Sequence, residues 1–313
     1  MPLSLVILAA GQGKRMHSDL PKVLQPLAGT PLLGHVLKAA RALAPDAVHI
    51  VYGHGGERVR SAFGEPDLRW ALQAEQLGTG HAVAQAMPEI PDDHQVLVLY
   101  GDVPLIDPTT LASLLGHAGP DGLALLSVQL EDATGYGRVL RDNAGNVYRI
   151  VEEKDANRKE KTVREANTGV LVANSARLKA WLARLTNDNA QGEYYLTDVI
   201  TLAVRDGIKV QAVPAPTAAE VLGVNDRMQL AHLEGEFRRG CANRLMRAGV
   251  TIIDPARLDV RGEVSTGRDV QLDVNVVLEG AVSIGDRVVI GPGCVIRNAN
   301  IEADTVKIGR AHV

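Results

Sequence analysis

The chain has 313 residues and a formal net charge of −4 at pH 7, so it has room for about two domains and offers no basic field to nucleic acid. Hydrophobic residues make up 46% of the chain, which is enough for a sizeable core. The two cysteines, Cys241 and Cys294, form no C-x-x-C pair and suit a reducing cytoplasm. No apolar segment approaches the roughly 18 residues of a membrane span, and the N-terminus lacks the basic start of a signal peptide. We therefore expect a cytoplasmic protein without nucleic-acid or membrane partners.

Short apolar runs alternate with amphipathic stretches from residue 1 to about residue 225. The apolar runs predict strands at Ser4–Ala9, Ala47–Tyr52, Val96–Tyr100, Leu123–Gln129, Val170–Ala173 and Lys209–Val213. The amphipathic stretches predict helices at Leu32–Leu43, His81–Met87, Pro108–His117, Ser175–Leu185 and Leu196–Arg205. This alternation is typical of a Rossmann-like α/β domain with a mainly parallel sheet, in which ligands collect at the carboxyl ends of the strands.

The first predicted strand runs directly into a glycine-rich loop, in the string LVILAAGQGKRMHSDLPKV. Gly11 and Gly13 present bare N–H groups to phosphate oxygens, and Arg15 and Lys22 would neutralise phosphate charge. The dinucleotide fingerprint G-x-G-x-x-G fails because Met16 stands at its third glycine, and no P-loop string occurs. The glycines alone fit either a phosphate loop of another kind or only a tight turn.

The string QAEQLGTGHA opens a predicted helix and contains Gln73, Gly78 and Thr79. Gln73 offers donors and acceptors that match the edge of a pyrimidine, and the other two residues would bring backbone groups against a flat base. A helix N-terminus capped by Thr79 is the simpler alternative.

The string VLVLYGDVP brings Asp102 to the end of a buried strand. A carboxylate there suits Mg²⁺, which takes a few carboxylates together with water and phosphate oxygens. Pro104 departs from the D-x-D pattern of glycosyltransferases, and a turn or capping aspartate is the alternative.

A hairpin with the turn DNAGN is predicted from Tyr136 to Asp155. Its ends hold Gly137, which leaves room for a ring, and two adjacent acids, Glu152 and Glu153, which can accept hydrogen bonds from hydroxyl groups. Because side chains alternate along a strand, only one acid faces a ligand. A solvated hairpin edge is the alternative for both, and we favour it for Glu153.

Two later strings add polar and aromatic side chains. The string NTG places Asn167 before a strand, where an ordinary turn is the alternative. The string QGEYYLTD contains Tyr194 and Tyr195, which would either wall a pocket or anchor the helix that follows.

The string VLGVND precedes a long helical pattern that ends at Gly249. Either Asn225 or Asp226 would cap this helix. Cys241 lies on its apolar stripe and is most simply part of the core.

The pattern changes after Val250, where aliphatic residues recur at every sixth position. One column contains Ile252, Leu258, Val264, Val270, Val276, Val282, Val288, Cys294 and Val306, and a second contains Leu272, Leu278, Ile284, Ile290 and Ile296. This period is the hexapeptide repeat of a parallel β-helix, and residues 251–306 would build about three coils. The last residues, 307–313, drop the register; a non-native read-through tail is one explanation, and we assign no function there, including to His312. We divide the chain into a domain at 1–225, a linker helix at 226–249 and a partial β-helix at 250–313.

These strings together resemble one family. LAAGxGxRM followed by PKVL resembles the opening loop of sugar-1-phosphate nucleotidyltransferases. The remaining motifs, up to about residue 306, resemble the bifunctional bacterial enzymes with N-acetylglucosamine-1-phosphate uridylyltransferase and glucosamine-1-phosphate N-acetyltransferase activities. The resemblance implies uridylyl transfer from UTP to N-acetyl-α-D-glucosamine 1-phosphate. The products are UDP-N-acetylglucosamine, for peptidoglycan and lipopolysaccharide precursors, and pyrophosphate. It also implies a left-handed β-helix, a homotrimer when full length, and an acetyltransferase site in later coils that this sequence lacks.

The resemblance further implies residue roles. Asp102 and Asn225 would hold Mg²⁺, which leaves Asp226 as the helix cap, and Arg15 and Lys22 would be the catalytic cations. Uracil would contact Gln73, Gly78 and Thr79, and the family register favours Glu152 over Glu153 at the sugar. The full set of implied substrate contacts is Leu8, Ala9, Ala10, Gly11, Gly13, Lys22, Gln73, Gly78, Thr79, Tyr100, Gly101, Asp102, Gly137, Glu152, Asn167 and Asn225.

Two alternatives stay open. One is thymidylyl or guanylyl transfer to another sugar phosphate, and the other is a non-catalytic scaffold that binds nucleotide sugars. The QGEYYLTD string and the fused β-helix favour the uridylyl reaction on an acetamido sugar. A scaffold would not need to keep a metal site.

Overall fold

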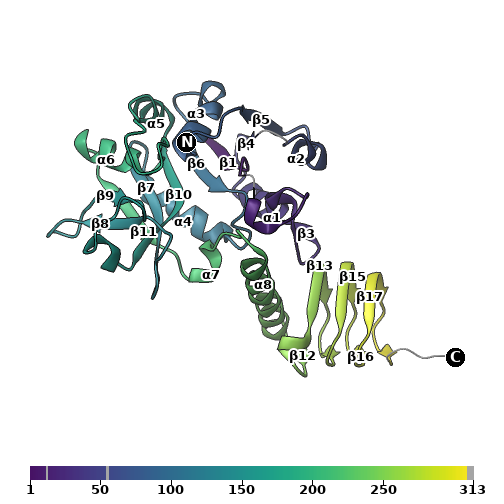
Figure 1. The fold of residues 1–313 in the computed structure, drawn as a ribbon. Coiled ribbons are helices and arrows are strands. Elements are labelled where there is room, and N and C mark those ends of the chain that lie inside the picture. The colour runs from purple at the N-terminus through teal and green to yellow at the C-terminus, as the bar shows by residue number, and fades with distance from the viewer. Residues whose placement is uncertain (12, 54–55, 309–313) are drawn as a thin grey trace. The chain divides into compact units, whose positions relative to one another are not determined.

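The structure is a computed structural model that describes residues 1–11, 13–53 and 56–308 (Figure 1). Gln12 of the glycine-rich loop and residues 309–313 of the tail, with His312, lie outside the described residues. The chain forms two compact units. The first contains residues 1–24 and 32–225, and the second contains residues 25–31 and the chain from Asp226 onward.

The first unit is built on a nine-stranded sheet. Its strands are β1 (Leu3–Leu8), β4 (Ala47–Gly53), β5 (Leu68–Gln73), β6 (Gln95–Tyr100), β7 (Leu123–Gln129), β8 (Arg138–Arg141), β9 (Val147–Val151), β10 (Glu165–Asn174) and β11 (Val210–Pro214). Seven of them follow the order β11-β7-β10-β6-β1-β4-β5, and β8 and β9 form a hairpin beside β10. Within this order only β10 runs antiparallel to its neighbours, so the mainly parallel sheet predicted from the sequence is confirmed.

Helices cover both faces of this sheet. One face packs against α1 (Leu32–Arg41), α2 (Glu57–Ala62), α4 (Pro108–Ala118) and α7 (Ala218–Val221). The other face packs against α3 (Thr79–Ala86), α5 (Ser175–Leu182) and α6 (Asp198–Arg205). Strands such as β1, β6 and β7 are apolar along almost their whole length because both of their faces are covered. Among the described residues of this unit, short 3₁₀ helices also lie at Lys14–Met16, Lys22–Leu24, Met87–Glu89 and Glu160–Thr162.

The second unit begins with a hairpin that follows Leu24 in the chain, formed by β2 (Pro26–Leu27) and β3 (Thr30–Pro31). This hairpin lies on the long helix α8 (Arg227–Arg247): the Ala28 N–H donates to Glu234 at 2.9 Å, and Arg227 donates to Gln25 Oε1 at 2.9 Å. Asp226 caps α8 as expected, because its side chain accepts a hydrogen bond from the Gln229 N–H at 2.8 Å.

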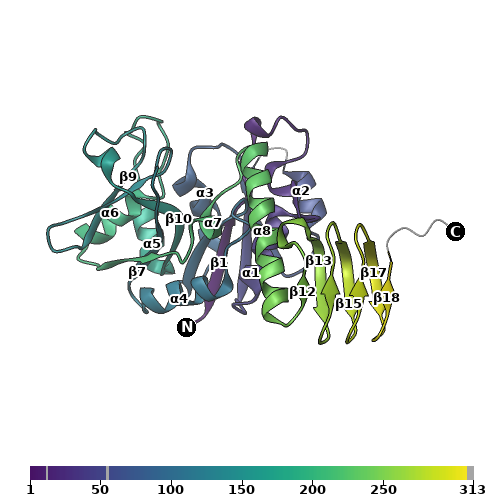
Figure 2. The same cartoon turned by 90° about the horizontal axis from the view of Figure 1, so that it is seen from below.

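The hexapeptide region forms a left-handed parallel β-helix. One sheet contains β12 (Thr251–Ile252), β14 (Gln271–Leu272), β16 (Val289–Ile290) and β18 (Val306–Lys307), and a 3₁₀ helix, Pro255–Arg257, interrupts the first coil. A second sheet contains β13 (Asp259–Thr266), β15 (Val277–Ile284) and β17 (Val295–Ile301), which Figures 1 and 2 show side by side. Residue 259 pairs with 277, and 277 pairs with 295, so one coil takes 18 residues, or three hexapeptides.

The corners of the β-helix also repeat every coil. Gly262, Gly280 and Asn298 stack at one corner with φ angles of 145°, 72° and 45°. A Cβ on Gly262 would lie 2.8 Å from the Gly280 backbone nitrogen, so the stacked coils leave no room for a side chain there. Gly262 therefore requires glycine both for its backbone conformation and for its packing, whereas Asn298 occupies the same corner in a later coil.

One position in the predicted apolar columns is wrong. Val306 pairs with Val289, an offset of only 17 residues, so the last coil is one residue shorter than the others. A slip of one residue turns a side chain to the opposite face. Val306 is accordingly 63% exposed, and Ala299 and Ile301 pack against the core instead.

Among the residues that the structure describes, none of the helices is both long and apolar enough to cross a membrane.

Candidate active site

The carboxyl ends of β6, β1, β4 and β5 lie along one edge of the sheet. Leu8 and Tyr100 are register partners, and the Gly101 N–H donates to the Leu8 carbonyl at 2.9 Å. Gln76, in the segment that follows β5, donates to the Ala10 carbonyl at 2.6 Å. The glycine-rich loop, the Gly101-Asp102 turn and the segment after β5 therefore meet at one edge, as the strand order predicts.

Lys22, Asp102 and Asn225 form the polar cluster at this edge. Lys22 Nζ forms an ion pair with Asp102 Oδ2 and donates to Asn225 Oδ1 at 3.2 Å. The side chains of Lys22 and Asp102 are only 12% and 16% exposed. A Cβ on Gly13 would lie 2.7 Å from Lys22 Cβ, so this lysine also packs against the glycine-rich loop. The Val224 N–H donates to the Asp102 carbonyl at 2.9 Å and places Asn225 beside that strand end.

The two predicted metal ligands converge on a single positive charge. One carboxylate oxygen of Asp102 and the amide oxygen of Asn225 both bond the Lys22 ammonium, so the site already accommodates a cation between them. Oxygens of this kind suit Mg²⁺. In the described part of the chain no three His, Cys, Asp or Glu side chains gather as a metal site. Water and phosphate oxygens would therefore have to complete the coordination shell.

The predicted uracil residues are held by contacts of their own. The buried Gln73 donates through Nε2 to the Gly78 carbonyl at 3.0 Å and lies 3.1 Å from His81 Nδ1. The Thr79 hydroxyl accepts a hydrogen bond from the Leu196 N–H at 3.1 Å. The alternative in which Thr79 caps α3 is wrong, because Gly78 is the N-cap residue and no side chain caps the helix.

Arg15 is not drawn into the cluster. It lies on the 3₁₀ helix Lys14–Met16 and is exposed, with no ion pair to any residue that the structure describes. Of the two predicted cations, only Lys22 therefore forms part of the cluster.

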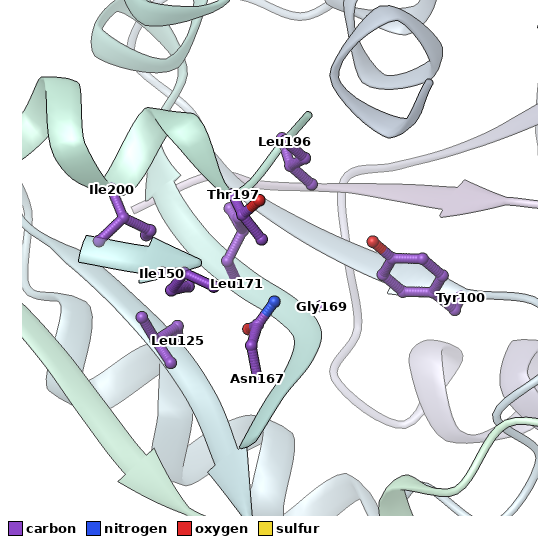
Figure 3. Close-up of a pocket in the computed structure, with 9 residues that line it drawn as sticks. All are labelled: Tyr100, Leu125, Ile150, Asn167, Gly169, Leu171, Leu196, Thr197 and Ile200. Carbon is purple, nitrogen blue, oxygen red and sulfur yellow. The ribbon is translucent and has the colours of Figure 1, made fainter. Parts of the chain in front are cut away.

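Beside this edge lies a pocket, shown in Figure 3, between strands and the start of α6. Its lining is Tyr100, Leu125, Ile150, Asn167, Gly169, Leu171, Leu196, Thr197 and Ile200. Neither tyrosine of the QGEYYLTD string is among these residues. Tyr195 is instead buried, with its hydroxyl accepting from Gln191 at 2.9 Å, which favours the anchoring alternative.

Gly137 and Glu152 face each other at the open end of the β8–β9 hairpin. A Cβ on Gly137 would lie 3.4 Å from both carboxylate oxygens of Glu152, and the Asn167 N–H donates to the Gly137 carbonyl at 2.8 Å. The Thr197 hydroxyl donates to Glu152 Oε1 at 2.9 Å. Burial raises the pKa of Glu152, although the Thr197 hydrogen bond opposes this shift, and the charge of Asp198 adds to it. Three predicted sugar residues are thus brought together.

Glu153 has a different environment from its neighbour. It forms ion pairs with the buried Arg138 at 2.7 Å and with Lys161 at 3.2 Å, and the hydrogen bond from Arg138 lowers the pKa of its carboxyl group. Glu153 therefore lies at the hairpin edge, 25% exposed and ion-paired, and alternation turns it away from the Glu152 face as predicted.

Gly169 supports the ring of Tyr100. Its φ is +86°, and a Cβ there would lie 2.6 Å from Cζ and 2.7 Å from Oη of the tyrosine. Burial, together with the charges of Glu152 and Asp102, raises the pKa of the Tyr100 hydroxyl, so this group remains a protonated donor. The sequence pattern does not distinguish Gly169 or Thr197 from their neighbours; Gly169 belongs to the string NTG, and Thr197 belongs to QGEYYLTD.

Comparisons with known proteins decide the family. The profile of the MobA-like NTP transferase domain matches residues 5–196, and the profile of the bacterial transferase hexapeptide (six repeats) matches residues 263–298. A bifunctional protein GlmU from Azoarcus sp. (strain BH72) is 59% identical over 311 residues, which cover 99% of this chain and 69% of the relative. This chain belongs to the GlmU family. The GlmU protein of Aromatoleum aromaticum is 58% identical, over 99% of this chain and 68% of its own length. The GlmU protein of Stutzerimonas stutzeri is 56% identical, over 100% of this chain and 69% of its own length.

Membership of the GlmU family confirms the resemblance seen in the motifs. The chain is a nucleotidyltransferase of the UDP-N-acetylglucosamine diphosphorylase type, which acts on a nucleotide and a sugar phosphate and requires a divalent metal. The crystal structure of a putative glucose-1-phosphate thymidylyltransferase from Bacillus anthracis, in complex with sucrose, has a TM-score of 0.59 and 18% identity. That similarity covers 74% of this chain and 94% of that one, and shows a shared fold.

Proposed function

We propose that uridylyl transfer takes place at the cluster of Lys22, Asp102 and Asn225. The observation that carries the proposal is that these three side chains converge at the carboxyl edge of the sheet. Asp102 and Asn225 lie 80 and 203 residues after Lys22 in the sequence. An oxygen of the sugar phosphate attacks the α-phosphorus of UTP, a new P–O bond forms, and the bond to the bridging oxygen of the β-phosphate breaks. Pyrophosphate leaves, and no covalent protein intermediate is needed.

The phosphate groups would be held mainly by charge and backbone donors. The loop from Leu8 to Gly13 offers N–H groups, while Lys22 and Arg15 neutralise the charge that builds on the triphosphate. Asp102 and Asn225 would hold Mg²⁺, which supplies positive charge beside phosphate oxygens when it is bound. Because Lys22 bonds both of these side chains, it would have to exchange them for phosphate oxygens as the substrates arrive.

The two ends of the substrates would occupy opposite sides of Tyr100. Gln73, Gly78 and Thr79 would contact uracil, and Gly137, Glu152 and Asn167 would contact the acetamido sugar. Supporting this division, both groups influence the same tyrosine: the charge of Glu152 raises the pKa of the Tyr100 hydroxyl, and Thr79 lowers it.

Pyrophosphate release from UTP, N-acetylglucosamine 1-phosphate and Mg²⁺ tests the proposal. We expect EDTA to abolish pyrophosphate release. We also expect the rate of release to fall sharply when glucose 1-phosphate replaces the acetamido sugar, and to be lower with other nucleoside triphosphates than with UTP. A folded protein that binds UDP-N-acetylglucosamine without turnover would instead support the non-catalytic scaffold. Equal rates with thymidine or guanosine nucleotides would support a different nucleotidyltransferase.

Replacement of Asp102 tests the metal assignment. We expect Asp102→Ala to retain the fold and to lose most turnover, about 10²-fold or more, because one ligand of the cation is gone. Asp107→Ala is the matched control, since Asp107 only caps α4 by accepting from the Thr109 N–H at 2.8 Å. Near-wild-type turnover in Asp102→Ala would contradict the assignment of Asp102 as a metal ligand.

We also infer that the protein, when full length, assembles as a homotrimer through its β-helix. Light scattering of the purified protein measures the mass directly, and a monomeric mass would contradict the inference.

A further inference from the structure

The hairpin of β8 and β9 presents two proposed sugar residues at its open end. Arg138 pairs with Val151, so Gly137 and Glu152 form the next position outward, beyond the last ladder pair. The hairpin is closed covalently only at its far end, by the turn at residues 142–146. An open end of two short strands frays unless tertiary contacts hold it, because a hairpin alone is only marginally stable.

Arg138 and Glu153 hold the two strands together at this end. Arg138 is only 2% exposed; its Nη2 donates to Glu153 Oε2 at 2.7 Å, and its Nη1 bonds the Tyr136 carbonyl. Glu153 Oε1 lies 3.2 Å from Lys161 Nζ, and Oε2 accepts a long hydrogen bond of 3.4 Å from the Gly135 N–H. The Glu153 carboxylate, which follows β9, therefore contacts three other segments: β8, the turn that precedes β8, and the 3₁₀ helix that precedes β10.

The pair lies next to the proposed sugar contacts without being one of them. Arg138 follows Gly137, and Glu153 follows Glu152, and alternation turns each of them away from the face that carries the Glu152 carboxylate. Arg138 also pairs with Ala166 of β10, which immediately precedes Asn167. A shift at the ion pair would therefore move all three proposed sugar residues.

We propose that the Arg138–Glu153 ion pair is a positioning element of the sugar site, which fixes the open end of the hairpin so that Gly137 and Glu152 meet the sugar in a single geometry. The inference rests on the proposed function, which assigns these two residues to the sugar. Arginine suits the position because its planar fork reaches the Tyr136 carbonyl and the Glu153 carboxylate at once, which a lysine ammonium on a flexible stem does not.

Kinetics of two conservative variants of the whole chain test the proposal. Glu153→Gln keeps the shape and removes the charge, whereas Arg138→Lys keeps the charge and removes the fork. We expect Glu153→Gln to raise KM for N-acetylglucosamine 1-phosphate about 10- to 100-fold, as small misplacements do, with KM for UTP changed by less than about twofold. Arg138→Lys should give a smaller rise in the same direction. Calorimetry with UDP-N-acetylglucosamine should show affinity falling by a similar factor.

The same hairpin supplies a matched control. Arg141, at the far end of β8, donates through Nε and Nη2 to Glu165 at 2.7 Å each, so this pair has the same chemistry at the turn end of the hairpin, where the Arg141 side chain is 37% exposed. We expect Glu165→Gln to change either KM by less than about twofold. A rise in both KM values in Glu153→Gln, or an equal effect of Glu165→Gln, would show a merely structural role and overturn the proposal.

A third variant separates this inference from the proposed function. If Glu152→Ala leaves the sugar-phosphate KM unchanged, the sugar assignment fails and the positioning role falls with it. If Glu152→Ala raises that KM and Glu153→Gln does not, only the positioning role is overturned. Circular dichroism and the thermal midpoint check each fold, and Arg138→Lys carries the test if Glu153→Gln fails to fold.

Discussion

Replacement of Gly169 by alanine should destabilise the first unit and disturb the pocket together. The new Cβ would lie 2.6 Å from Cζ and 2.7 Å from Oη of Tyr100, well inside van der Waals contact, at a backbone φ of +86°. A non-glycine residue in left-handed backbone costs about 1–2 kcal/mol, and overpacking a filled core costs about 1–3 kcal/mol. The sum is a loss of about 2–5 kcal/mol in the free energy of unfolding.

A second glycine separates the two costs. Gly145 has a φ of +84°, almost the same as Gly169, but no heavy atom lies within 4 Å of the position its Cβ would take. Gly145→Ala should therefore lose only the backbone cost of about 1–2 kcal/mol. Reduced unfolded-state entropy, which alanine causes in both variants, cancels in the comparison.

Urea unfolding, followed by tryptophan fluorescence, gives the difference between the two variants. We expect Gly169→Ala to be less stable than Gly145→Ala by about 1–3 kcal/mol, and to have a higher KM for the sugar phosphate because Tyr100 must move. Equal losses in the two variants would refute the close packing of Gly169 on the ring.

Two further expectations concern the charged groups of the site. Glu152→Gln should stabilise the protein at pH 7 while it lowers activity. The pKa of Glu152 is higher in the folded than in the unfolded protein, where it is about 4.5, so the ionised carboxylate lowers the free energy of unfolding at pH 7. In urea titrations the gain in stability of Glu152→Gln should therefore disappear as the pH falls to about 4.5. A gain that persists at low pH would contradict this sign. Lys22→Ala should bind Mg²⁺ more tightly in calorimetry without nucleotide, because the competing ammonium is gone, yet turn over about 10²-fold more slowly. The exposed Lys14→Ala is its control, and unchanged Mg²⁺ affinity in Lys22→Ala would argue against the competition.

Hydrophobic patterning was enough to predict most of the fold. Strands with both faces buried, such as β6 and β7, form continuous apolar runs, and the six-residue period predicts the β-helix before any contact is known. β5 was missed because its alternating residues are half exposed on an edge strand, and the four-residue α7 is too short to show a helical period. The single-residue slip before Ala299 shows in the aliphatic spacing only as a gap at Asn300, and the valine at the expected position 306 conceals the shift.

The site was predictable only in part, for a related reason. Asp102 follows a strand and Asn225 precedes a helix, so each is conspicuous locally, but only the fold brings both to Lys22. The Arg138–Glu153 pair has no local signal, since its partners are 15 residues apart on facing strands. Glu152 and Glu153 are both glutamates, yet their pKa shifts are opposite: burial is the largest cause of the rise at Glu152, and the hydrogen bond from Arg138 is the largest cause of the fall at Glu153.

The hairpin at residues 25–31 means that no single cut separates the two units. The chain crosses between them three times, after Leu24, before Leu32 and after Asn225. A polypeptide ended after Asn225 would keep Leu27, which is fully buried, while losing Arg227 and Glu234, which bind the segment around it. Such a fragment would expose an apolar loop only a few residues from Lys22. A separable catalytic unit would need Leu24 joined to Leu32 by a short polar linker in addition to the new C-terminus.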